Sequence, residues 1–311
     1  MKVYYNTETL PAFRKAVVTI GTFDGVHLGH CQVIEQLKKE ALRIGGETVM
    51  VTFDPHPRKI VSTKPLQLIN TLAEKTVLLE KQGIDHLVVV PFTLAFSAQA
   101  ADQYVEDFLI SRFHPHTVII GYDHRFGNNR SGDFKLLEQY AARHAFELIE
   151  IPGRVIDEMT ISSTKIREAL LTGKPEEAHR FLGYDYFFEG TVTAGNKLGR
   201  TLGYPTANLQ VEDNDKLVPA NGVYAVQVQL IDEPGNEQFF KGMMNIGVRP
   251  TVDGTRKVIE VNIFDFDKDI YGRTLRVYVK KFLRGEQKFN GLDGLKEQLA
   301  KDKLHALKNL F

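Results

Sequence analysis

The sequence predicts a doubly wound α/β domain that is followed by an all-β domain and a closing helix. Up to about residue 151, apolar β-type runs alternate with helical patterns, the order that builds a parallel sheet covered by helices. From about residue 184, short β runs follow one another, as in an antiparallel barrel or sandwich. Leu292, Leu295 and Leu299 then fall on one face of a helix expected over residues 292–310.

The strands of the first half read as nearly continuous apolar runs, which is typical of parallel strands buried on both faces. We expect them at residues 17–21, 48–53, 86–92, 117–121 and 147–151. The helices between them are expected at about residues 28–44, 72–82, 98–112 and 133–145. Thr71 and Glu74 form a capping box before the second of these helices. Ligands of such a domain bind beyond the carboxyl ends of its strands.

The second half is predicted to contain β runs joined by short turns. They are expected at residues 188–192, 223–231, 238–247, 257–266 and 274–282. The change in periodicity places the domain boundary near residues 180–184.

The bulk composition limits the possible functions. The chain has 311 residues and zero formal net charge, which argues against broad nucleic-acid binding because that needs a strongly basic face. The single cysteine, Cys31, excludes an internal disulfide and fits a reducing compartment. The first residues lack the apolar core of a signal peptide, and no apolar run approaches the roughly 18 residues of a membrane span. We therefore expect a cytoplasmic protein that binds neither nucleic acid nor a membrane.

The stretch GTFDGVHLGH, residues 21–30, is the strongest indication of a ligand site. It joins a predicted strand to a predicted helix, and its glycines let the backbone approach a ligand closely. His27 and His30 are three residues apart, so both side chains can lie on one face of the first helical turn. The free N–H groups of that turn bind anions. We expect a polyphosphate here, with one imidazole donating a hydrogen bond to a phosphoryl oxygen.

Other interpretations of this stretch are less favoured. The two histidines could be ordinary helix-start residues with no ligand. A zinc site would need further ligands that the stretch does not supply. Neither of the two usual glycine fingerprints for nucleotides, G-x-x-x-x-G-K-[ST] and G-x-G-x-x-G, is present.

Residues 161–167, ISSTKIR, give a second indication of phosphate binding. Ser163 and Thr164 are good N-cap residues, and Arg167 falls early in the helix that follows, where the helix dipole disfavours cations. A bound phosphate would remove that local conflict. Solvated cations that are tolerated at small cost are the alternative.

Two strand-end loops are expected to converge with GTFDGVHLGH on one edge of the sheet. Asp123 follows the fourth predicted strand and could hold a polar group of a ribose or a flavin. Phe53 ends the second strand, beside two prolines that stiffen the turn, and could form an apolar wall for a planar ring. A solvated loop and plain turn chemistry explain the same residues about equally well.

The second half contains its own candidate nucleotide loop. Three glycines at four-residue spacing stand among two cations, which suits a phosphate-cradling loop: Gly195, Lys197, Gly199, Arg200 and Gly203. Pro205 favours an extended chain after it, so Thr206 and Asn208 can point the same way. Their hydroxyl and amide oxygens are hard ligands suited to Mg²⁺. A turn-rich hairpin connection without a ligand is the alternative.

Glu260 is the candidate base of this half. It shares one face of its predicted strand with Val258, Asn262 and Phe264. A carboxylate in such surroundings could take a proton from a substrate hydroxyl, the role of the base in phosphoryl transfer. A solvent-facing strand glutamate is the alternative.

Together these motifs resemble the bacterial bifunctional riboflavin kinase/FMN adenylyltransferase family, also called FAD synthetases. GTFDGVHLGH and ISSTKIR resemble the adenylyltransferase half, which is related to the wider cytidylyl- and adenylyltransferase superfamily. The stretches that resemble the riboflavin kinase barrel are GNKLGRTLGYPTANL, NGVYAV, MNIGVRPT and IEVNIFDFDKDIYG. The resemblance covers nearly the whole chain.

The resemblance implies a Rossmann-like nucleotidyltransferase domain over residues 1–182 and a six-stranded antiparallel barrel with a C-terminal helix over residues 183–311. It implies ATP-dependent phosphorylation of riboflavin to FMN, followed by adenylyl transfer from a second ATP to give FAD and pyrophosphate. Both steps would use Mg²⁺, with ATP as co-substrate.

The resemblance also implies roles for individual residues. The candidate ATP contacts of the adenylyltransferase are Gly21, Phe23, Asp24, Gly25, His27, His30, Ser163, Thr164 and Arg167, with His27 and His30 as the catalytic pair. The candidate flavin contacts are Asp123 and Phe53, whereas His124 stands where many relatives are expected to have an aromatic residue. The candidate ATP contacts of the kinase are Gly195, Lys197, Gly199, Arg200, Gly203 and Thr206, with Thr206 and Asn208 at the metal and Glu260 as base.

Two rival functions are left by the sequence. One is a single-activity nucleotidyltransferase whose barrel is a non-catalytic binding module. The other is a nucleic-acid-binding protein that uses the barrel as a platform, which the zero net charge and the absence of Trp make less favourable.

Overall fold

The computed structural model describes residues 1–122, 124–152, 161–195, 198–232, 238–251 and 254–310. The chain divides into two compact units, residues 1–163 and 164–311. Helices α9 (Ser163–Leu171) and α10 (Pro175–Leu182) thus fall almost wholly in the second unit, where α10 packs against the barrel strand β12 (Thr274–Arg284).

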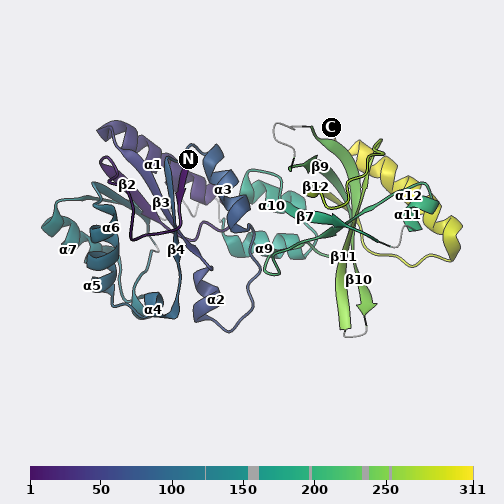
Figure 1. Ribbon diagram of the computed structural model, residues 1–311. Helices are drawn as coiled ribbons and strands as arrows, with labels where there is room; N and C mark the ends of the chain where they lie inside the picture. The colour runs from purple at the N-terminus through teal and green to yellow at the C-terminus, as the bar shows by residue number, and fades with distance from the viewer. Residues whose placement is uncertain (123, 153–160, 196–197, 233–237, 252–253, 311) are drawn as a thin grey trace. The chain divides into compact units, whose positions relative to one another are not determined.

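The first unit is built on a six-stranded parallel sheet (Figure 1). Its strands are β1 (Lys2–Tyr4), β2 (Ala16–Ile20), β3 (Glu47–Asp54), β4 (His86–Pro91), β5 (Thr117–Gly121) and β6 (Glu147–Ile151). Their spatial order is β1-β4-β3-β2-β5-β6, so the direction of winding reverses between β2 and β5. The loops after these two strands therefore flank the switch point, where doubly wound sheets bind their ligands.

Helices cover both faces of this sheet (Figure 1). α1 (Leu28–Ile44) and α3 (Leu72–Lys81) bury apolar residues against one face. The π-helix of residues Tyr104–Ile110 and α7 (Phe134–His144) cover the other. The remaining short helices of the unit are α2 (Pro57–Val61), α4 (Leu94–Ser97), α5 (Ala101–Gln103), α6 (Ser111–Phe113) and a 3₁₀ turn at Asn128–Arg130.

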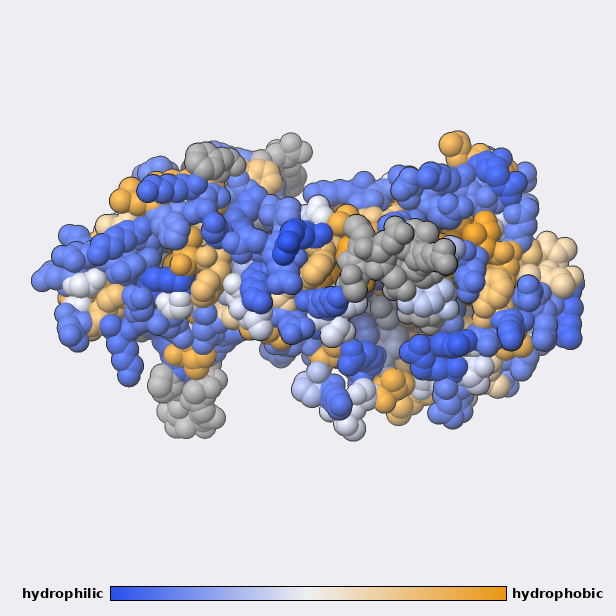
Figure 2. Space-filling view, turned by 180° about the vertical axis from the view of Figure 1, so that it is seen from behind, coloured by the Kyte–Doolittle hydropathy of each residue, from blue (hydrophilic) through white to orange (hydrophobic). Residues whose placement is uncertain are grey.

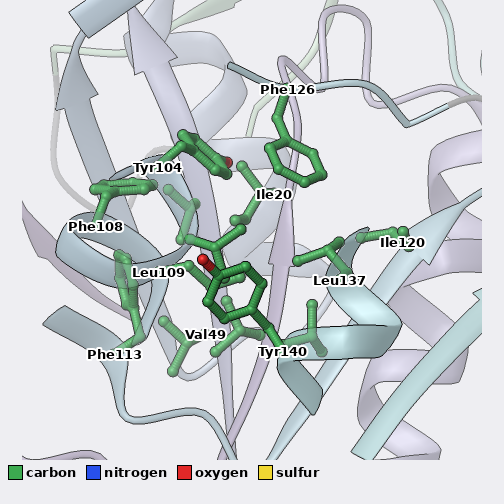
Figure 3. Close-up of a cluster of buried hydrophobic side chains, with 14 of the residues drawn as sticks. Ile20, Val49, Tyr104, Phe108, Leu109, Phe113, Ile120, Phe126, Leu137 and Tyr140 are labelled. Atoms are coloured by element: carbon green, nitrogen blue, oxygen red, sulfur yellow. The ribbon is translucent and has the colours of Figure 1, made fainter. Parts of the chain in front are cut away.

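The core beneath the π-helix is rich in aromatic rings (Figure 3). Phe108 lies edge-on to Phe113 with ring centroids 5.4 Å apart, and Tyr104 stacks on Phe126 at 5.0 Å. The phenol of Tyr140 enters the same cluster and donates to the carboxylates of Asp102 and Glu106, at 2.9 and 2.8 Å. This packing fixes the start of the loop after β5, because Phe126 belongs to that loop.

The second unit is a closed six-stranded barrel with the order β10-β11-β8-β7-β12-β9. The strands not yet bounded are β7 (Phe187–Thr193), β8 (Ala207–Gln210), β9 (Gly222–Leu230), β10 (Phe240–Thr251) and β11 (Gly254–Ile263). All barrel pairings are antiparallel. The long helix α12 (Gly291–Lys308) packs on the outside, against β9, β10 and β12, and a short α11 (Leu198–Thr201) precedes β8.

The predicted fold class is confirmed, with corrections to one helix and to two short strands. The helix expected at residues 98–112 is divided into α5, the π-helix and α6, and a separate α4 precedes it. Strands β1 and β8 were not predicted, because three or four residues are too few to show a period. The capping box of α3 is present: Thr71 Oγ1 accepts from Glu74 N at 3.2 Å, and Glu74 Oε2 accepts from Thr71 N at 2.9 Å.

Hydrophilic residues predominate on the face drawn in Figure 2, where hydrophobic side chains form separate patches. Within the described ranges, no helix combines the length and the apolar character that crossing a membrane would need.

Candidate active sites

The loop of residues 21–27 runs from the carboxyl end of β2 to the first turn of α1. It is anchored at its start, where Gly21 N donates to Val51 O at 3.0 Å. Phe23, Gly25 and Val26 all have positive φ angles, of 46°, 93° and 37°. Two of these residues carry side chains, so the loop holds a conformation that only firm packing maintains. That packing comes from Phe23 and Val26, which are both buried in the core below α1.

His27 and His30 form one stacked pair at the start of α1. Their ring centroids are 3.6 Å apart with the planes inclined by 14°. His27 is the N-cap residue, and its Nδ1 accepts a hydrogen bond from His30 N at 3.3 Å. A neutral His27 therefore carries its ring proton on Nε2.

His30 is an uncharged member of this pair at neutral pH. Burial, and then the nearby His27 and Lys75, hold the pKa of His30 well below its usual range. Its Nδ1 atom is buried and has no hydrogen-bond partner among the described residues. An orphaned buried nitrogen is costly, and a ligand or a water that pairs with it would remove that cost.

Two buried charged residues support the loop from below. Asp24 is 1% exposed, and its Oδ1 accepts from Ile69 N at 3.0 Å and from Asn70 N at 3.2 Å. Lys75 is 6% exposed, and its Nζ donates to Thr22 O at 2.8 Å. Sequence reasoning missed Lys75, because a lysine within an amphipathic helix gives no sign of being buried.

The candidate phosphate residues of ISSTKIR lie at the boundary between the two units. Ser163 Oγ donates to Asp24 O at 2.9 Å, which joins the start of this motif to the histidine loop. Thr164 and Arg167 follow in α9 and belong to the second unit. Their ATP contacts stay predictions.

Of the candidate flavin residues, Phe53 is described and Asp123 lies outside the described residues. Phe53 is half-buried near the end of β3, and its ring lies 5.3 Å from that of Phe92 and 5.8 Å from that of Phe96. Phe53 therefore belongs to a group of three phenylalanine rings. Its role towards a flavin stays a prediction.

Two candidate kinase residues of the barrel, Asn208 and Glu260, are cross-strand neighbours. Glu260 of β11 is paired in register with Asn208 of β8 on one side and with Asn245 of β10 on the other. Residues in register point to the same side of a sheet, so the carboxylate and both amides lie on the outer face of the barrel. The predicted alternation of β11 is confirmed, since Glu260 and Asn262 line one cavity while Val261 is fully buried.

That cavity has a volume of about 330 Å³ and lies between the outer face of the barrel and α12. Its polar side holds Thr206, Asn245, Glu260 and Asn262. Its apolar side is formed by Leu202, Met243, Phe289, Leu295 and Leu299. An apolar slot with a few convergent polar groups suits a planar, largely apolar ligand that carries a polar chain.

Arg249 donates to both carboxylate oxygens of Glu260 through a single nitrogen. Its Nη2 atom lies 3.0 Å from Oε1 and 3.1 Å from Oε2, and the Glu260 side chain is 22% exposed. Arg249 itself is exposed enough to swing away. No sequence pattern indicates this partner, because the two residues are brought together by the register of the β10–β11 hairpin.

Thr206 lines this cavity and also a second one of about 480 Å³. Arg200 and the loop after β11, from Phe266 to Tyr271, line the second cavity. A side chain shared by two neighbouring cavities is well placed to contact two ligands that react with each other.

The glycines of the predicted phosphate loop are closely approached by other groups. A Cβ at Gly195 would lie 2.0 Å from Asn208 Nδ2, and one at Gly199 would lie 2.3 Å from Tyr204 O. Lys197 lies outside the described residues, and Gly203 has a φ of +84° that favours glycine. Within the described ranges there is no cluster of three His, Cys, Asp or Glu side chains that could hold a metal. The hard oxygens at hand are those of Thr206 and Asn208, which fit Mg²⁺.

Comparison with known proteins covers both units. Residues 10–165 match a family model described as FAD synthetase, and residues 182–310 match one described as riboflavin kinase. A bifunctional riboflavin kinase/FMN adenylyltransferase of Listeria monocytogenes is 40% identical over 92% of this chain and 90% of its own length. The protein with the same description from Bacillus subtilis is 36% identical over 94% of this chain and 92% of its own.

A solved structure matches nearly the whole chain. A crystal structure from Streptococcus pneumoniae, described as a macrolide-efflux protein, matches with a TM-score of 0.87 and 32% identity over 98% of each chain. That description differs from those of the curated relatives, which agree with both family models.

Proposed function

Because the chain belongs to the bifunctional riboflavin kinase/FMN adenylyltransferase family, we propose how its two units divide the two reactions. The chain phosphorylates riboflavin to FMN with ATP, and it transfers an adenylyl group from ATP to FMN to give FAD and pyrophosphate. We assign the first reaction to the barrel and the second to the parallel-sheet unit. The presence of both family matches speaks against a single-activity enzyme with a non-catalytic barrel.

The kinase site lies in the cavity between the barrel and α12. The apolar side of the cavity takes the flavin ring, and the ribityl chain reaches Glu260. Glu260 accepts the proton of the terminal hydroxyl as that oxygen attacks the γ-phosphorus of ATP, and ADP leaves. This assignment is carried by one observation: a strand carboxylate lines a partly apolar cavity beside the two candidate metal ligands.

ATP of the kinase occupies the second cavity, with Thr206 between it and the flavin. Arg200 on the wall of that cavity supplies a cation for the phosphates. Thr206 and Asn208 would hold Mg²⁺, which would supply positive charge for the transferring phosphoryl group. Gly195, Gly199 and Gly203 allow the backbone to approach the nucleotide, and Lys197 is proposed as a further contact.

The adenylyl-transfer site lies at the histidine loop. The nucleophile is the FMN phosphate, which is mostly dianionic at neutral pH because its second pKa is about 6. It needs no base; it needs neutralisation and in-line placement at the α-phosphorus while pyrophosphate leaves. His27 and His30 donate hydrogen bonds to the phosphates of ATP. The loop that receives these phosphates is shaped by Gly21, Phe23, Asp24 and Gly25.

The remaining contacts of this site come from other segments. Ser163, Thr164 and Arg167 are proposed to contact the same nucleotide, and Asp123 and Phe53 the flavin. We place the functional boundary after residue 182, which agrees with the start of the riboflavin kinase match at residue 182 and lies beyond the structural division after residue 163. A cytoplasmic site of action, and the absence of nucleic-acid and membrane partners, complete the proposal.

Product analysis of two variants tests the division of labour. Purified protein with riboflavin, ATP and Mg²⁺ is expected to give FMN and then FAD by chromatography. Glu260→Gln keeps the volume of the side chain and should lower FMN formation by about 10²–10⁴-fold while FMN is still converted to FAD. His30→Asn should do the reverse, so that FMN accumulates. Equal loss of both steps in both variants would contradict the assignment of two separate sites.

A further inference from the structure

Lys75 is a buried cation that sequence reasoning did not connect with any site. It lies in α3, yet only 6% of its surface is exposed, and its Nζ donates to Thr22 O at 2.8 Å and to Thr52 Oγ1 at 3.3 Å. Burial lowers the pKa of Lys75, and the nearby carboxylates of Asp24 and Asp54 oppose that effect. A lysine in such a place is expensive unless its contacts serve a purpose, since the same helix offers solvent-facing positions.

The contact with Thr22 sets the direction of one peptide group in the histidine loop. In a planar trans peptide the C=O and the following N–H point to opposite sides. Because Lys75 holds the carbonyl of Thr22, the N–H of Phe23 points away from the lysine. No hydrogen-bond partner of that N–H occurs among the described residues, so it is a donor available for an anion.

Lys75 also acts on His30 through space. The groups that lower the pKa of His30 are, after burial, His27 of the same helix and Lys75 of α3. The acidic groups near Lys75 are Asp24 and Asp54. Asp24 Oδ1 accepts hydrogen bonds from the N–H groups of Ile69 and Asn70. The ammonium of Lys75 thus orients the peptide that carries the Phe23 N–H and lowers the pKa of the His30 imidazole.

We propose that Lys75 is a positioning residue of adenylyl transfer, which fixes the carbonyl of Thr22 so that the Phe23 N–H faces a phosphate oxygen of the nucleotide. The inference rests on the proposed function of the histidine loop. Lys75 does not itself touch the substrate. Its charge also adds, after burial and His27, to the lowering of the pKa of His30.

The test uses the full chain, in which the second activity serves as an internal control. Lys75→Met removes the ammonium at nearly unchanged length, and Lys75→Gln keeps an N–H donor without the charge. Both should lower kcat/KM for ATP in FMN-to-FAD conversion by at least tenfold, Lys75→Met more than Lys75→Gln, with riboflavin phosphorylation unchanged. Lys38→Met is the matched control, because Lys38 also donates to a backbone carbonyl, that of Gln82 at 2.7 Å, but is exposed.

Histidine NMR gives a readout that a merely structural role would not move. In protein labelled with ¹³C at histidine Cε1, the His30 signal is assigned by its absence in His30→Asn. Its titration midpoint should move to higher pH in both Lys75 variants, because a nearby positive charge is gone, and should stay in place in Lys38→Met.

Each outcome decides one point. Adenylyl transfer at the wild-type rate in both Lys75 variants would overturn the positioning role. The role would also be overturned if the titration midpoint of His30 did not move and the loss of activity matched a lower melting temperature of the variants. If Lys75→Met does not fold, Lys75→Gln alone decides. Full adenylyl transfer in His30→Asn would instead overturn the proposed site, so the two failures are distinguishable.

Discussion

Removal of Asp302 tests whether α12 holds the kinase cavity together. Asp302 is 3% exposed and accepts from Arg284 Nε at 2.9 Å and Nη2 at 2.7 Å, and from Gln298 Nε2 at 2.9 Å. This pair joins α12 to the end of β12, and both of its members line the cavity. In Asp302→Ala the guanidinium of Arg284, whose side chain is 16% exposed, loses its partner.

The size of the effect follows from that burial. Removing one member of a buried pair costs about 3–5 kcal/mol, because the other charge stays desolvated. Arg284 keeps some contact with solvent, so we expect a loss near the lower end, about 3 kcal/mol. For a unit of this size, that lowers the melting temperature by about 10 °C. Because the displaced helix carries Leu295 and Leu299 of the cavity, KM for riboflavin should rise as well.

The assay combines thermal unfolding by circular dichroism with both activities. Asp293→Ala is the matched control, since Asp293 is exposed in the first turn of the same helix and its removal costs at most about 1 kcal/mol through the helix dipole. A melting temperature of Asp302→Ala within about 2 °C of the control would refute the reasoning. So would an equal loss of FMN-to-FAD conversion, which does not use this cavity.

Three further predictions concern single positions. Because the pKa of His30 is lowered in the folded protein, the unfolded chain protonates this imidazole at a higher pH than the folded chain does. The free energy of unfolding, measured by urea titration, should therefore fall as the pH drops below about 6.5, and it should fall less in His30→Asn. Gly199→Ala should raise KM for ATP of the kinase, because its Cβ would lie 2.3 Å from Tyr204 O, whereas Gly285→Ala, with open space around it, should leave steady-state rates unchanged. Phe108→Ala should destabilise the parallel-sheet unit by about 3–5 kcal/mol in denaturant unfolding, with kinase activity retained.

Much of the fold could be predicted, because its long elements carry strong periods. The runs at β2, β4 and β5 are nearly continuous in apolar residues, which is typical of strands covered on both faces. β8 has four residues and β1 has three, so both depend on neighbouring strands for their existence. The π-helix was also beyond prediction: its residues pattern as an ordinary helix, and the wider turn is visible only in the backbone.

The candidate sites divide along a similar line. The sequence could group His27 with His30, and Thr206 with Asn208, because local spacing alone brings them together. It could not supply Arg249 as the partner of Glu260, since that pair depends on the register of a hairpin. Nor could it show that Lys75 is buried, because burial is decided by how α3 lies on the sheet.

The two sites differ in the way that their nucleophiles require. An alcohol must lose a proton as it attacks, and the barrel cavity offers Glu260 with both oxygens held at about 3 Å by a guanidinium that can swing away. A phosphate dianion carries no proton to lose, and at the histidine loop the carboxylate of Asp24 is turned to backbone N–H groups instead. A nucleotide bound there as proposed would meet the N–H groups of the histidine pair and not a carboxylate. A carboxylate facing the FMN phosphate would repel it, so the proposed adenylyl transfer calls for no catalytic carboxylate at this loop.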